Sequence, residues 1–133
     1  DGMQVVTASM DRTAKLWNAS TGDELRTLVD ESHVSSAAFS PDGMQVVTTS
    51  WARIAKLWNA ATGDELHTLN SHHTGSSCVN SAAFSPDGMQ VVTASMDRTA
   101  KLWNASTGDE LRTLVDESHV SSAAFSPDGM QVV

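Results

Sequence analysis

This sequence has little of what a disulfide-bonded or linker-rich protein needs. Cys78 is the only cysteine among 133 residues, so no internal disulfide can form and packing alone must hold the fold. A single cysteine favours a reducing compartment, and we therefore expect a cytoplasmic location. Charged residues make up 18% of the chain and hydrophobic residues 40%, a balance typical of a globular protein and not of a disordered one.

Positive charge is scarce as well. Eight Lys and Arg residues face sixteen Asp and Glu residues, which gives a formal net charge of -8. The basic residues are spread along the chain, so we expect no nucleic-acid partner and no binding to an anionic membrane. No apolar run approaches the roughly 20 residues that span a bilayer, and the N-terminus shows no signal-peptide pattern.

The dominant feature is an internal repeat. The string D-G-M-Q-V-V begins at residues 1, 42, 87 and 128, and residues 1–47 recur unchanged as 87–133. A period of 40 to 45 residues indicates a solenoid or a propeller. We divide the chain, as one repeat array, into repeat A (1–41), repeat B (42–86), a second repeat A (87–127) and the start of a further repeat (128–133).

Each period predicts four short strands. In the middle of the chain a turn at 41–43 and another at 61–64 separate runs rich in Val, Thr and Trp. No segment keeps the apolar spacing of a helix. The apolar-polar alternation is imperfect, as expected for sheets buried on both faces. The predicted strands are residues 34–40, 45–50, 54–58 and 65–69.

The motifs resemble the WD-repeat β-propeller family over essentially the whole chain. The residues that carry the likeness are H-T-G, the S-P-D-G turn and the stretch S-M-D-R-T-A-K-L-W-N. Asn18, Asn59 and Asn104 stand where the family usually has the Asp that follows Trp. The resemblance implies an all-β propeller of four-stranded antiparallel blades, with strands a to d running from the centre outward.

By that resemblance the chain starts inside strand b and holds three blades' worth of strands. The first blade lacks strand a, and a predicted strand at 120–126 lacks its blade. Propellers have about 4–8 blades, so three cannot close a ring. We expect a homo-oligomer that shares a strand between chains, and we favour a trimer of nine blades over a dimer of six, because tightening a ring overpacks its inner strands.

One ambiguity in this scheme concerns identical sequences. Residues 128–133 repeat residues 1–6, so both would compete for one strand-b position in a closed ring. Either one copy is frayed, or the chain comes from a longer array.

The resemblance also implies a structural hydrogen-bond tetrad made by a His before strand a, a Ser or Thr ending strand b, an Asp in the b–c turn and the strand-c Trp. The third blade has all four, the first lacks its own His, and in the second Ala52 replaces the Asp. His33 and His119 are out of the family's register. The matching residues are His73, Ser95, Asp97 and Trp103, then Ser9, Asp11 and Trp17, then Ser50 and Trp58.

No pattern favours an enzyme, a cofactor or a metal ion. The mixture of His, Ser and Asp that suggests hydrolysis is explained by the tetrad. His72, His73 and Cys78 lack zinc-ligand spacing, because adjacent His side chains rarely converge on one ion. No Gly-rich phosphate loop opens a helix.

What remains is a surface for binding a protein or peptide. The family places its d–a and b–c loops on one face, and Trp and Arg are enriched where interfaces are strongest. We expect a non-catalytic scaffold that self-assembles and presents this face; the alternative is a designed or fragmentary self-assembling ring with no natural ligand. The candidate residues are Met10, Arg12, Trp51, Arg53, Met96 and Arg98, beside the loop 70–78.

Repeat B differs most from repeat A in the stretch S-W-A-R-I-A, against S-M-D-R-T-A. The missing Asp and the missing in-register His fall in one blade, so the tetrad is expected to be lost there as a unit. Ile54 is expected to repack strand c. We expect Trp51 to join that repacking, with an exposed anchor as the alternative.

Overall fold

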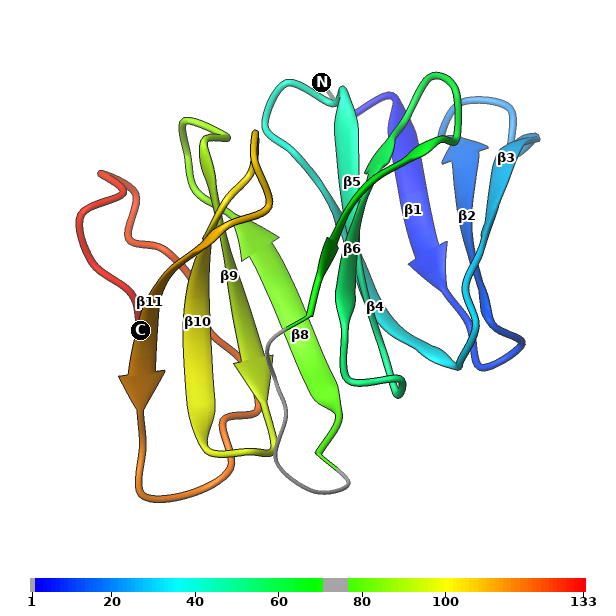
Figure 1. Ribbon diagram of the computed structural model, residues 1–133. Coiled ribbons are helices and arrows are strands. Elements are labelled where there is room, and N and C mark those ends of the chain that lie inside the picture. Colours follow the sequence, from blue (N-terminus) through cyan, green and yellow to red (C-terminus); the bar gives the residue numbers. More distant parts are fainter. Residues whose placement is uncertain (1, 71–76) are drawn as a thin grey trace.

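Three antiparallel sheets stand side by side in the computed structural model, which describes residues 2–70 and 77–133 (Figure 1). No helix in these residues is long and apolar enough to cross a membrane. We refer to the sheets, in chain order, as the first, second and third blade. The first holds β1 (Gln4–Ala8), β2 (Thr13–Asn18) and β3 (Glu24–Val29). The second holds β4 (Val34–Phe39), β5 (Gln45–Ser50), β6 (Ala55–Asn59) and β7 (Glu65–Leu69). The third holds β8 (Val79–Phe84), β9 (Gln90–Ser95), β10 (Thr99–Asn104) and β11 (Glu110–Val115).

Strands within each blade follow chain order, so every blade is a meander. The strands at 45–50 and 65–69 were predicted with the bounds observed. The strand predicted at 34–40 ends one residue earlier, and the one predicted at 54–58 is shifted by one residue to Ala55–Asn59. All-β architecture in antiparallel sheets of three or four strands is therefore observed.

The strand predicted at 120–126 is not formed. The segment makes one isolated bridge, between Phe125 and Val132, and backbone hydrogen bonds on either side of it join Ala124 to Val133 and Ser126 to Gln131. A strand needs a partner along its whole length, and only the last residues of the chain turn back beside it.

Each S-P-D-G stretch closes the hairpin between strands a and b. Ser40 Oγ donates to Asp42 Oδ1 at 2.6 Å, and the Met44 N–H donates to the same oxygen at 2.9 Å. These hydrogen bonds, the one from Ser40 first, lower the pKa of Asp42. Gly43 has a φ of 72°, a conformation that suits glycine. The same bonds recur at Ser85 and Asp87.

Neighbouring blades pack through two different faces. We define the leucine face of a blade by its strand-c and strand-d Ala and Leu residues, and the tryptophan face by its strand-c Trp and by the strand-b Val that pairs with it (Val5, Val46 or Val91). The leucine face of the first blade meets the tryptophan face of the second in a cluster of Ala14, Leu16, Leu28, Val34, Val46 and Trp58. The second and third blades meet in the same way through Val47, Ala55, Leu57, Leu69, Val91, Trp103 and Ala105.

Polar contacts reinforce both interfaces near the outer strands. Arg26 of the first blade donates to the carbonyl oxygens of Ala61 and Thr62 in the second. His67 of the second blade takes the place of that arginine, and its Nε2 lies 2.8 Å from Ser106 O of the third. The same two faces and equivalent polar contacts therefore join the first blade to the second and the second blade to the third.

Leu57 tests this packing. Its side chain is fully buried between blades, so Leu57→Ala should lower the free energy of unfolding by about 2–5 kcal/mol. Leu66 on the adjacent strand is 40% exposed, and Leu66→Ala should change it by less than about 0.5 kcal/mol. Chemical denaturation measures both, and equal losses would contradict the interface.

Candidate protein-interaction face and its hydrogen-bond network

Each strand-c tryptophan donates to a threonine of strand b. The Nε1–Oγ1 distance is 2.9 Å for Trp17 with Thr7, and it is the same for Trp58 with Thr48 and Trp103 with Thr93. Sequence reasoning placed a serine from strand b in this network and missed the threonines. The threonine two residues before each serine lies on the same side of the strand, so the two-residue period could have found it.

The predicted serines end strand b or directly follow it, and Ser9 and Ser95 form hydrogen bonds in the b–c turn. Ser95 Oγ accepts from the Asp97 N–H at 3.2 Å and donates to Cys78 O at 3.1 Å. Ser9 Oγ accepts from the Asp11 N–H in the same way. Ser50 Oγ is buried and has no hydrogen-bond partner among the described residues, which leaves a polar atom uncompensated in the second blade.

The turn aspartates bind a threonine two residues on. Asp11 Oδ1 accepts from the backbone N–H of Thr13 at 3.0 Å and from its hydroxyl at 2.5 Å. The hydroxyl bonds from Thr13 and then Ser9 lower the pKa of Asp11. Asp97 and Thr99 repeat this geometry at 2.9 and 2.5 Å. The aspartate therefore fixes the turn and the start of strand c.

The second blade replaces both members of this pair. Ala52 stands where Asp11 and Asp97 stand, and Ile54 where their threonines stand. The two substitutions remove the donor and the acceptor of the same hydrogen bond, so neither group is left without its partner. His73, which was predicted for the tetrad, and His72, which was weighed with it as a metal ligand, lie outside the described residues.

An arginine in each b–c turn has left-handed backbone geometry. The φ angles are 74° at Arg12, 68° at Arg53 and 70° at Arg98. A residue with a Cβ pays about 1 kcal/mol for this conformation, which glycine adopts freely. The three arginines are exposed, so each turn presents a cation.

Trp51 is exposed, which corrects the expectation that it repacks into the site left by the aspartate. Its side chain is 48% exposed, and its indole meets the His33 ring edge-on with centroids 4.8 Å apart. His33 Nδ1 in turn contacts Met10 O. The indole of Trp51 thus packs on the His33 ring at the surface, whereas Ile54, in the position of the turn threonine, is half-buried. Met10 and Met96 are also exposed, at 63% and 39%.

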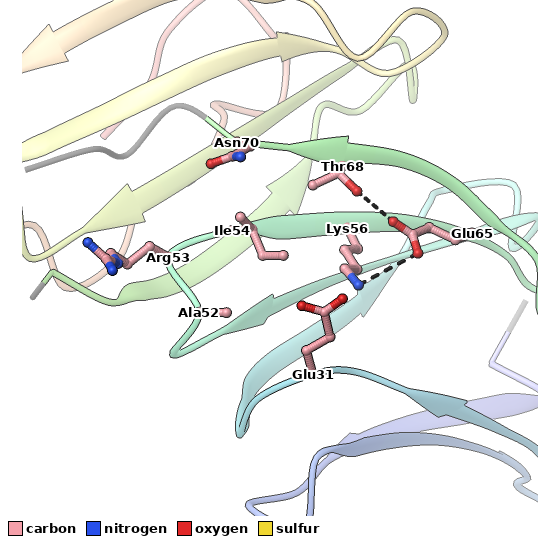
Figure 2. Close-up of a pocket in the computed structure, with 8 residues that line it drawn as sticks. All are labelled: Glu31, Ala52, Arg53, Ile54, Lys56, Glu65, Thr68 and Asn70. Carbon is pink, nitrogen blue, oxygen red and sulfur yellow. Dashed lines mark hydrogen bonds and ion pairs between the residues drawn. The ribbon is translucent and has the colours of Figure 1, made fainter.

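A hollow of about 470 Å³ opens beside this turn (Figure 2). In it Lys56 Nζ lies 3.6 Å from Glu65 Oε2, and the Glu31 carboxylate points toward the same ammonium. Ala52, Ile54 and Asn70 line the hollow and are positions where repeat B departs from repeat A. The full lining is Glu31, Ala52, Arg53, Ile54, Lys56, Glu65, Thr68 and Asn70.

The chain belongs to the WD40 family. The matching family is described as WD domain, G-beta repeat, and the match covers residues 1–18, 22–59 and 63–104. No curated protein matches the chain. Proteins of this family usually serve as non-catalytic scaffolds. Within residues 2–70 and 77–133, no group of three or more His, Cys, Asp or Glu side chains could hold a metal ion.

Reintroducing the Asp–Thr pair into the b–c turn of the second blade tests whether the two side chains stabilise each other. Ala52→Asp alone regains only an acceptor for the backbone N–H of residue 54, and Ile54→Thr alone adds a hydroxyl without its carboxylate. The double substitution recreates in the second blade the hydroxyl–carboxylate bond that Thr13 makes to Asp11 in the first. A double-mutant cycle in denaturant should give a favourable coupling of about 1 kcal/mol. The equivalent cycle with Asp97→Ala and Thr99→Ile in the third blade is the control. Additive effects at both places would contradict the pairing.

Proposed function

We propose that this WD40 chain is a non-catalytic scaffold that closes into a propeller ring with further copies of itself and presents the loop face of its middle repeat to a protein or peptide. The ring part of the proposal rests on the two outer blade faces. The binding part rests on where repeat B departs from repeat A. The runner-up is a ring that assembles and has no ligand.

The observation that supports assembly is a difference in burial between equivalent residues of the repeats. Val5 is 47% exposed in the first blade, whereas the corresponding Val46 and Val91 are fully buried. Trp17 is only partly buried, whereas Trp58 and Trp103 are 6% and 2% exposed. The tryptophan face of the first blade thus has the composition of a buried face, and within residues 2–70 and 77–133 no blade covers it.

The opposite end of the array offers the complementary surface. On the leucine face of the third blade, Leu102 and Leu114 are partly exposed, whereas the corresponding Leu16 and Leu28 are buried. A leucine face that meets a tryptophan face between two copies would repeat the contact made twice inside the chain. Such a head-to-tail contact closes a ring when its rotation closes.

We propose three copies and nine blades for the ring, with two copies and six blades as the alternative. Fewer blades turn more sharply from one to the next, which overpacks the inner strands, whereas a wider ring mainly opens a channel that water can fill. The chain mass of 14.1 kDa makes the two assemblies easy to separate.

Native mass spectrometry tests the assembly. We expect a species of three chain masses, because the two exposed faces bury each other in a ring. Val5→Asp places a charge in that contact and should shift the distribution to the monomer. Leu25→Asp is the matched control, because Leu25 is 46% exposed and its counterpart Leu66 stays 40% exposed beside a packed neighbour. A monomer for the unsubstituted chain would refute the ring, and a dimer would refute nine blades.

The binding part of the proposal concerns the turn around Trp51. Repeat B differs from an otherwise closely matched repeat A at Trp51, Ala52, Ile54 and Asn70, and the last three of these residues line one hollow. A half-exposed tryptophan held by His33 is a rigid apolar anchor, and Arg53 adds a cation beside it. This arrangement suits an extended peptide with an apolar side chain and a neighbouring carboxylate.

Selection from a displayed peptide library tests this site. The unsubstituted chain should enrich peptides that bind it at least tenfold more tightly than they bind Trp51→Met, the residue of repeat A. Met96→Ala in the third blade is the control and should leave binding unchanged. Enriched peptides that bind all three proteins equally, or no enrichment, would favour the ring without a ligand.

A further inference from the structure

The a–b and c–d turns of each blade lie at the same end of the sheets, and the b–c turns lie at the other end. Alternate turns of an antiparallel meander come to one end, and Figure 1 shows the a–b and c–d turns along its upper edge. In the second blade the Ala60 N–H donates to Met44 O at 2.9 Å, which joins the two turns. A Cβ on Gly88 would lie 3.5 Å from Pro41 Cδ, so the a–b turns of the second and third blades are also neighbours. These turns therefore form one surface.

Large apolar side chains are exposed on this surface. Met44 and Met89 follow the a–b turns of the second and third blades and are 68% and 65% exposed. Leu66 and Leu111, the second residues of β7 and β11, are 40% and 50% exposed. Met44 and Leu66 line one hollow of about 280 Å³, although the second blade has a neighbour on both sides. The exposure at this hollow therefore belongs to the turns and not to an uncovered blade face.

Carboxylates surround these apolar side chains. In the second and third blades each a–b turn and each c–d turn presents one exposed aspartate. Hydrogen bonds, the one from the preceding serine first, lower the pKa of the a–b turn aspartates Asp42 and Asp87, so both stay charged at neutral pH. The arginines of the b–c turns lie at the opposite end of the blades. We define the Met–Asp face by its apolar residues Met44, Leu66, Met89 and Leu111 and its aspartates Asp42, Asp64, Asp87 and Asp109.

Three basic side chains of the outer strands flank the Met–Asp face. Arg26 donates to two carbonyls of the c–d turn in the second blade, and the His67 ring contacts Ser106 O in the c–d turn of the third. Arg112 holds the equivalent position in β11. With His67 neutral, two cations stand beside four aspartates, so the face is anionic.

The hollow on this face also contains an acceptor without a partner. Gln45 lines the hollow, and its Oε1 is buried with no hydrogen-bond partner among the described residues. A buried acceptor is stabilised when a donor reaches it. The excess of carboxylates favours a donor with positive charge. The hollow therefore suits an ammonium or guanidinium group beside an apolar side chain.

The backbone of these turns is already engaged. The Gly43 N–H donates to Ser40 O at 2.9 Å, and the Gly63 N–H donates to Asn59 O at 2.8 Å. Extended peptides gain affinity by adding to the free ladder of a sheet edge, and tight turns present no such ladder. A helix satisfies its backbone groups internally and offers one apolar side and one charged side. A helix is therefore the form of partner that this surface suits.

We propose that the Met–Asp face binds an amphipathic helix of a partner protein, with apolar side chains against the methionines and leucines and with Lys or Arg side chains beside the aspartates. Met suits this contact because its flexible thioether side chain adapts to the shape of an apolar surface. The carboxylates select the charge of the helix and speed its approach. The Met–Asp face lies at the opposite end of the blades from Trp51, so this proposal depends neither on the loop face nor on ring closure.

A synthetic helix of about 18 residues, with Leu on one side and Lys on the other, is the probe. Isothermal titration calorimetry measures its affinity for the full chain. It should bind at least about tenfold more tightly than a Leu–Glu analogue and than a peptide of the same composition in scrambled order. Its affinity should fall as the salt concentration rises. Equal affinities for the three peptides, or no binding, would overturn the proposal.

Paired methionine substitutions locate the site. Met44→Gln with Met89→Gln should weaken binding of the Leu–Lys peptide at least about fivefold, because polar groups replace the apolar contact. Met10→Gln with Met96→Gln, on the b–c turns, is the matched control and should leave the affinity unchanged. All four methionines are exposed, so neither pair should disturb the fold, and far-ultraviolet circular dichroism checks this. Equal effects of the two pairs would show that the peptide does not bind the Met–Asp face.

The aspartates are tested by the same design. Asp64→Asn with Asp109→Asn should weaken binding of the Leu–Lys peptide and reduce its dependence on salt. Glu31→Gln with Glu117→Gln removes the same charge from exposed positions at the opposite end of the blades and should do neither. If both pairs lower the affinity alike, the peptide responds to the net charge of -8 and the proposal is wrong.

Discussion

The contact between a leucine face and a tryptophan face is the constraint on which the rest of this structure depends. A single four-stranded sheet of Val, Leu, Ala and Trp has two apolar faces and no core of its own. The side chains of each face are buried only when the next blade covers them. Leu57 of the second blade and Trp103 of the third are buried against each other's blades in this way. The indole then lies in an apolar layer, and its N–H needs the internal acceptor that Thr93 provides.

The b–c turns work under a different constraint. They are not buried between blades, so they can change without loss of the core. Repeat B shows this, because Asp and Thr become Ala52 and Ile54 while β5 and β6 keep the register of their counterparts. The cost appears only locally, in the buried Ser50 hydroxyl that has no hydrogen-bond partner among the described residues.

The sequence predicted the strands of the second blade to within one residue, and the family, because repeated turn signals and strand composition are local properties. It did not predict the threonines that accept from the tryptophans. The two-residue period places each threonine on the same side as the predicted serine, but which of the two hydroxyls faces the indole depends on the offset between two paired strands. It also gave the wrong outcome for Trp51. The choice between an inward and an outward ring depends on His33, which comes from the loop before β4, two strands earlier in the chain.

Identical segments make the division between sequence and tertiary structure unusually clear. Residues 1–47 and 87–133 have one sequence, and that sequence determined the antiparallel strands, the S-P-D-G turns and the Asp–Thr pairs in both places. Tertiary structure alone decided that Val5 is half-exposed and Val91 buried, and that residues 34–39 form β4 whereas 120–125 form no strand. The physical reason is that burial and strand pairing belong to a residue and its neighbours together, and identical residues here have different neighbours.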